Sequence, residues 1–165
     1  TKVGGAPEDD IARLLAITQG HPGCRLILDA NGGWTAQQAL SALDTLQAAG
    51  VTPLLLEQPV AREDWDGLAE VTANTSVPVA ADESCRSVSD ARRIASHRMA
   101  DVLNIKLAKV GVAGAKQIVQ IARESGLELM IGAMVETLIA TGFAAHMVSG
   151  MGGFSYVDLD TARLG

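Results

Sequence analysis

Short apolar runs alternate with longer segments of helical period along the whole of this 165-residue sequence. Such alternation is typical of repeated strand–helix units, in which the strands run parallel and the helices make the return connections. No Pro- or Ser-rich linker interrupts the pattern, so we expect one sheet covered by helices. The predicted strands are 1–3, 25–29, 54–57, 77–81, 102–105, 127–131 and 154–158, and the predicted helices are 9–19, 35–49, 65–73, 87–96, 113–125 and 136–149.

A charged residue stands at the C-terminal end of nearly every predicted strand. The intervals are 27 residues from Lys2 to Asp29, 28 to Glu57, 25 to Asp82, 24 to Lys106, and 52, or two units, to Asp158. One such residue per unit would converge on the mouth of a (β/α) barrel, whereas a doubly wound sheet would spread them along an edge. We therefore predict an α/β fold, an incomplete barrel of the TIM type with about seven of the eight strands.

Charge and composition narrow the choice of partners. A net charge of −6 and a pI near 4.9 argue against nucleic acids and anionic membranes, because no basic stripe could neutralise phosphates. A small-molecule substrate fits better, and a homo-oligomer is compatible with the sequence. Cys24 and Cys85 have neither disulfide nor zinc spacing, the first residues lack the apolar stretch of a signal peptide, and Glu128 and Glu136 interrupt the most apolar segment. We expect a soluble, cytoplasmic protein.

Three carboxylates, Asp29, Glu57 and Asp82, end three consecutive apolar strands. Such groups repel one another unless a cation binds between them. Mg²⁺ prefers oxygen ligands and keeps open positions for water or a substrate carboxylate. The alternative is that each acid caps the following helix or pairs with a basic side chain, but three acids in register favour a metal site.

Lys2 and Lys106 flank this trio and would face each other across a closed barrel. A metal beside lysines suggests removal of the proton next to a carboxylate, because the metal stabilises the resulting negative charge. The metal and a pocket of low dielectric constant would lower a lysine pKa, so that a neutral amine could act as the base. With one lysine on each face, removal and return of the proton inverts the stereocentre. Alternatively, Lys2 is a solvated terminal lysine, or Lys106 forms a Schiff base.

The strand ends LILDANGGW, LLEQP, VAADES, VLNIKLAKVG, IGAMVET and VDLDT resemble those of enolase-superfamily barrels of the muconate-lactonizing type, over essentially the whole chain. The superfamily combines a lysine or histidine base with Mg²⁺. The resemblance implies that Lys106 and Lys2 are the catalytic lysines, Lys2 being the second lysine of a Lys-x-Lys motif. It further implies that Asp29, Glu57 and Asp82 bind the metal, and that the residues that orient them are Asn31, Glu83, Asn104 and Glu136. A carboxylate at a helix N-terminus is the alternative for Glu136.

The predicted last strand ends in Asp158 and Asp160, an Asp-x-Asp pair that resembles the dipeptide epimerases. By this resemblance the two aspartates bind the free ammonium of a dipeptide, and Met134 also contacts the substrate. Two neighbouring carboxylates are well suited to a cation, although a loop aspartate that caps the next turn is an alternative. The resemblance implies a Mg²⁺-dependent isomerase that epimerises dipeptides such as those of Ala and Glu.

Other functions stay open at this point. A muconate-type cycloisomerase, an N-acylamino-acid racemase or an o-succinylbenzoate synthase would share the barrel, but an uncharged acyl group would give the two aspartates nothing to bind. By the resemblance, residues 1–165 are a barrel domain without the N-terminal lid domain, the first strand and the C-terminal helices. A chain of this kind could also be an inactive fragment or a non-catalytic binding module.

Overall fold

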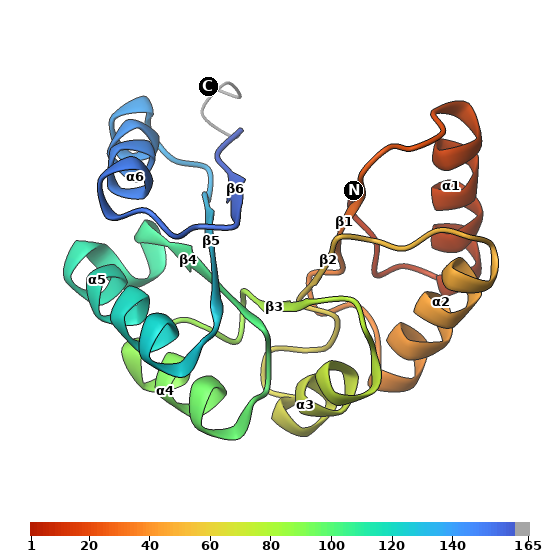
Figure 1. Ribbon diagram of the computed structural model, residues 1–165, viewed down its shortest axis with the longest axis horizontal. Coiled ribbons are helices and arrows are strands. Elements are labelled where there is room, and N and C mark those ends of the chain that lie inside the picture. Colours follow the sequence, from red (N-terminus) through yellow and green to blue (C-terminus); the bar gives the residue numbers. More distant parts are fainter. Residues whose placement is uncertain (161–165) are drawn as a thin grey trace.

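The computed structural model describes residues 1–160, in which helices and strands alternate (Figure 1). Within these residues, no helix is both long enough and apolar enough to cross a membrane. The strands are β1 (Ile27–Asp29), β2 (Leu55–Glu57), β3 (Val79–Ala81), β4 (Val102–Lys106), β5 (Glu128–Gly132) and β6 (Tyr156–Asp158). The helices are α1 (Pro7–Gly20), α2 (Ala36–Ala48), α3 (Trp65–Asn74), α4 (Val88–His97), α5 (Leu107–Ser125) and α6 (Leu138–Met151).

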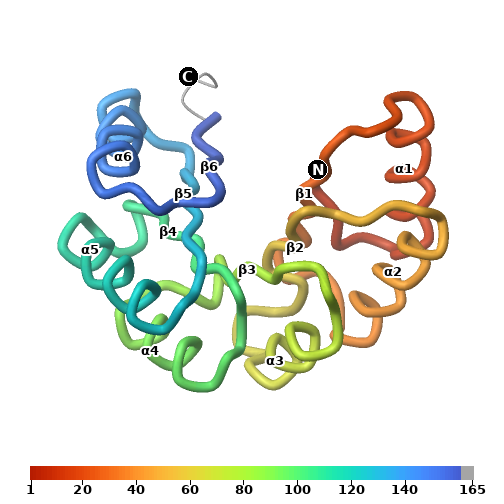
Figure 2. The backbone as a smooth tube through the Cα atoms, viewed as in Figure 1, coloured from red at the N-terminus to blue at the C-terminus, as the bar shows by residue number. Residues whose placement is uncertain are grey.

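The six strands form one parallel sheet in the order β1-β2-β3-β4-β5-β6. Because the order never reverses, the sheet is not doubly wound. It curls, and all the helices lie along its convex side (Figure 1), so that the chain advances around a single axis (Figure 2). The prediction of an incomplete barrel of the TIM type is confirmed, with six strands in the described part rather than seven.

The predicted strand 1–3 is wrong as a strand, because only a single parallel bridge joins Lys2 to Asp29. The amide of Val3 donates to the carbonyl of Asp29 at 2.8 Å, and the amide of Asp29 donates to the carbonyl of Thr1 at 3.0 Å. The segment therefore lies beside β1 as the neighbouring strand would. Lys2 is placed next to Asp29, at the edge of the sheet.

Two apolar layers hold the sheet. The larger layer fills the space between the strands and the helices, and a smaller one lies on the concave face of the strands. The inner layer contains Leu55, Ala80, Val102 and Met130, with Ile27 and Tyr156 packed against it. Since side chains alternate between the faces of a strand, residues two positions further along point to the same side. The inner layer thus lies directly beneath the polar side chains at the strand ends.

Candidate active site

The three carboxylates lie on neighbouring strand ends. Asp29 ends β1 and is paired in register with Glu57, which ends β2, while Asp82 directly follows β3. Asp82 and Glu57 are buried, each with 2% of its surface exposed, and Asp29 is nearly so. Carboxylates are rarely buried unless they are paired or bind a metal. The strand register therefore gathers three acids where they need cationic partners.

Two of these carboxylates are paired with lysines. Lys2 forms an ion pair with Asp29, and Lys106 Nζ donates to Asp82 Oδ2 at 2.7 Å. Lys109 Nζ donates to the other oxygen of Asp82, Oδ1, at 2.6 Å and to its backbone carbonyl at 2.7 Å. Both oxygens of Asp82 thus accept from ammonium groups.

Glu57 has no ammonium partner within these contacts. Its Oε1 accepts from Asn104 Nδ2 at 2.7 Å, and Asn104 is fully buried. Burial, followed by the negative charges of Asp29 and Asp82, raises the pKa of Glu57 to about 7. For Asp82, burial acts in the opposite direction to Lys109 and Lys106, and the two lysines prevail and lower its pKa. The unfavourable electrostatic energy of three neighbouring acids therefore falls mainly on Glu57, the acid that no ammonium group contacts.

The two candidate bases differ in exposure. The side chain of Lys106 is 13% exposed, whereas that of Lys2 is 72% exposed. Burial acts to lower the pKa of Lys106, but Asp82 raises it overall, and Asp29 does the same for Lys2. The carboxylates by themselves thus oppose the low pKa that a lysine base needs. A divalent cation bound by the same carboxylates would counteract this effect.

The chemistry of this donor set fits a hard divalent cation. The candidate ligands are all carboxylate oxygens. Burial raises the pKa of Glu57, and the negative charges of Asp29 and Asp82 raise it further, a repulsion that a cation would relieve. As placed, residues 1–160 contain no group of three acidic, histidine or cysteine side chains close enough to hold an ion. Because lysines pair with Asp29 and Asp82, a metal would have to displace ammonium groups from these carboxylates.

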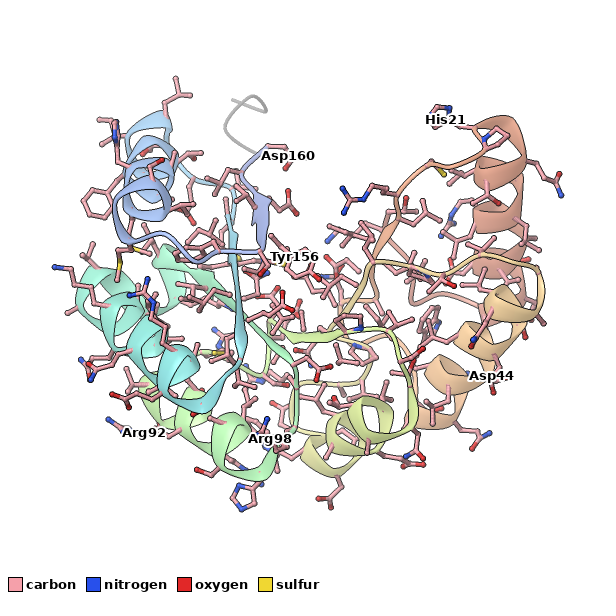
Figure 3. The ribbon with its side chains drawn as sticks, in the orientation of Figure 1. His21, Asp44, Arg92, Arg98, Tyr156 and Asp160 are labelled. Atoms are coloured by element: carbon pink, nitrogen blue, oxygen red, sulfur yellow. The ribbon has the colours of Figure 1, made fainter. Side chains whose placement is uncertain are left out.

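A cavity of about 450 Å³ opens over these strand ends. Both candidate lysines and both candidate substrate aspartates line it, together with two of the acids: Lys2, Lys106, Asp158, Asp160, Asp29 and Glu57. Asp158 ends β6, and Asp160 lies just beyond it, past the end of the strand opposite to Tyr156 (Figure 3). Burial and the charge of Asp160 raise the pKa of Asp158. A cationic group bound between the two aspartates would relieve that repulsion.

The predicted supporting residues fall into two groups. Asn31 holds Asp29 through its backbone amide, at 3.0 Å from Oδ1, and its side chain donates to Glu83 at 3.1 Å. Asn31 and Asn104 therefore contact two of the acids, Asp29 and Glu57, whereas Glu83 is joined to Asp29 only through Asn31. Glu136 instead accepts from the backbone amide of Met134 at 3.0 Å. Neither of these two lines the cavity, although the adjacent Ala133 does.

Two residues at the site are not among those predicted from the sequence. Lys109, 8% exposed, fixes Asp82 as described above. Gln58, fully buried, donates to the Val60 carbonyl and to Ser84 Oγ, and its Oε1 accepts from the amides of Asp82 and Ser84. Gln58 thereby ties the loop that carries Asp82 to the end of β2. The only sequence signal for either is a polar residue close to a predicted ligand or base.

Comparison with known proteins places this geometry in context. The model of the family described as "Enolase C-terminal domain-like" matches residues 1–164. The L-Ala-D/L-amino acid epimerase of Populus trichocarpa is 54% identical over 99% of this chain, and the aromatic dipeptide epimerase of Herpetosiphon aurantiacus is 48% identical over 92%. The chain spans only 40% and 43%, respectively, of these two relatives.

A solved structure gives the same picture. The dipeptide epimerase of Enterococcus faecalis, in complex with Mg and the dipeptide L-Leu-L-Tyr, superposes with a TM-score of 0.93 and is 39% identical. The match covers 97% of this chain and 46% of that one. A protein that shares this fold has thus been solved with a metal and a dipeptide.

Proposed function

The chain belongs to the enolase C-terminal domain-like family, and from this premise we propose that it is the barrel part of a Mg²⁺-dependent dipeptide epimerase. The observation that carries the proposal is the single cavity lined by two lysines, two metal-type carboxylates and the Asp158–Asp160 pair. Epimerisation needs a proton acceptor and a proton donor at one carbon. It also needs a positive charge to stabilise the negative charge that the substrate carries between the two proton transfers. The cavity contains a candidate for each of these roles.

The proposed metal ligands are Asp29, Glu57 and Asp82. When bound there, Mg²⁺ would supply the positive charge that makes the proton next to the substrate carboxylate more acidic. Asn104 holds Glu57 in place through its 2.7 Å hydrogen bond. Lys109 and Gln58 hold the side chain and the loop of Asp82, so that its position does not depend on Lys106 alone.

Lys106 and Lys2 carry the proton in the proposed reaction. One lysine, as the neutral amine, takes the proton from the carbon, and the other lysine, as the ammonium, gives a proton to the opposite face. Lys106 lies at the end of β4 and Lys2 beside β1, so the substrate would be held between them. Transfer between two lysines inverts the carbon, whereas transfer to and from one lysine exchanges the proton without inversion.

Asp158 and Asp160 would bind the ammonium of the dipeptide. Burial and the charge of Asp160 raise the pKa of Asp158, and a cation placed between the two aspartates would be stabilised by both charges. This requirement separates a dipeptide epimerase from an N-acylamino-acid racemase, whose substrate has no ammonium. The names of the relatives, which refer to dipeptides with different side chains, support the substrate class.

The experiment compares free L,L-dipeptides with their N-acetylated forms, using the complete protein and Mg²⁺. We expect acetylation to lower kcat/KM on the order of a hundredfold, because it removes the charge that the aspartates bind. In Asp158→Asn this preference should shrink. Asp44→Asn, on the outer surface of α2 (Figure 3), is the matched control and should keep the preference. Equal turnover of both forms by the wild-type protein would instead indicate an N-acylamino-acid racemase.

A further inference from the structure

The strand ends around the cavity carry charged side chains, with one exception. Lys106 on β4 is paired in register with Gly132 on β5, and Gly132 is in turn paired with Asp158 on β6. The 52-residue interval between Lys106 and Asp158 has its midpoint at Gly132. On β5, the position that corresponds to a charged residue on the neighbouring strands therefore has no side chain.

The space beside Gly132 is filled by two residues of the site. A Cβ atom at Gly132 would lie 2.9 Å from Lys106 Cε, 2.9 Å from Asn104 Oδ1 and 3.0 Å from Asn104 Nδ2. Carbon atoms do not approach that closely without a shift of their neighbours. The backbone angles of Gly132 are outside the left-handed region, so an alanine at this position would not strain the backbone. Its Cβ would instead make steric contacts that are too close.

The two neighbours differ in their freedom to move. Asn104 is fully buried and bonded to Glu57 at 2.7 Å. Lys106 has a long flexible stem, and the contact falls on Cε, next to the ammonium nitrogen. A methyl group at position 132 would therefore push the end of Lys106 away from β5. Of the glycines in residues 1–160, only Gly132 would place a Cβ against Asn104 and Lys106, which contact Glu57 and Asp82, respectively.

We propose that Gly132 is a positioning residue for Lys106. The ammonium group of Lys106 can occupy its position in the active site only because residue 132 has no side chain. This inference rests on the proposed function, since it assigns Lys106 to one face of the substrate. Displacing Lys106 should impair proton transfer on that face and leave the face served by Lys2 intact. General loss of the fold would impair both faces alike.

The test measures proton exchange at the α-carbon in D₂O for each epimer of one dipeptide separately, with the complete protein and saturating Mg²⁺. Lys106→Ala and Lys2→Ala first identify which epimer depends on which lysine. In Gly132→Ala, we expect exchange of the Lys106-dependent epimer to slow on the order of a hundredfold, as for an active-site group misplaced by about 1 Å. Exchange of the other epimer should stay near the wild-type rate.

Gly142→Ala in α6 is the matched control, because a Cβ there meets nothing within 4 Å, and it should leave both rates unchanged. In the Lys106→Ala background the contact with Cε is gone and only the contacts with Asn104 remain, so Gly132→Ala should slow exchange by a smaller factor there than in the wild-type protein. Equal slowing of both epimers by Gly132→Ala, no slowing of either, or failure of both the single and the double variant to fold would overturn the inference. Absence of any exchange by the wild-type protein would overturn the proposed function itself, and this inference with it.

Discussion

In the complete protein, Lys106→Ala is expected to lower the rate of epimerisation by about a thousandfold or more, because inversion needs a proton-transfer group on each face. Lys106 is largely buried, lies at the end of β4 and lines the same cavity as Lys2 and Asp158. Exchange of one epimer should persist, since Lys2 can still remove and return a proton on its own face. The measurement is the initial rate of inversion by NMR or chiral chromatography, with exchange in D₂O followed in parallel.

Metal binding separates this effect from damage to the site. Asp82 keeps its contacts with Lys109 when Lys106 is removed, so Mg²⁺ affinity should be unchanged or higher, because an opposing positive charge is gone. Lys116→Ala, which removes an exposed lysine from α5, is the control and should retain full activity. Inversion at an undiminished rate in Lys106→Ala would rule out the two-lysine mechanism.

Glu57→Gln should lower the affinity for Mg²⁺ by about a hundredfold or more, since loss of a residue that merely supports a metal ligand already costs 10- to 100-fold. The amide keeps the size of the side chain and can still accept the hydrogen bond of Asn104. The loss would therefore report the charge and ligand strength of Glu57. Isothermal titration calorimetry measures it, with Glu63→Gln, on the surface, as the control.

The pH dependence gives this prediction a second readout. In the metal-free protein the pKa of Glu57 is raised from 4.5 to about 7, so the folded state holds a proton that the unfolded state releases. Stability should then fall as pH rises from about 4.5 to about 7, and Mg²⁺ affinity should rise as the proton leaves. Glu57→Gln should remove this contribution to both slopes. Wild-type affinity and slopes in Glu57→Gln would exclude Glu57 as a ligand.

The sequence predicts the fold because its two periodicities agree. Buried strands and amphipathic helices alternate at intervals close to one unit, and the charged residues that end the strands fix the register. The structure confirms that Asp29 and Glu57 pair in register and that Lys106 ends β4. The strand predicted at 1–3 fails because only Lys2 forms a bridge. A single bridge and a short strand have the same sequence pattern.

The contacts that hold the site are less accessible to sequence reasoning. In NIKLAKVG, the helix α5 begins immediately after β4 and is broken at Gly111, where φ is 64°. Lys109 lies in the short helical turn before this break, and neither a strand nor a helix period would predict its contact with Asp82. Gln58 has a φ of 39°, rare for a residue other than glycine, so its side chain reaches the Asp82 loop from an irregular backbone. Both contacts depend on the local course of the backbone just after a strand end.

The most direct test of the central claim is proton exchange by the complete wild-type protein in D₂O, followed by NMR with a set of free L,L-dipeptides. With Mg²⁺, we predict deuterium uptake together with inversion at the α-carbon next to the carboxylate, and neither after chelation of the metal. The α-carbon of the amino-terminal residue is an internal control, since no carboxylate is attached to it, and should keep its proton. Uptake without Mg²⁺, uptake at the amino-terminal carbon, or no uptake with Mg²⁺ bound would contradict the proposed epimerase.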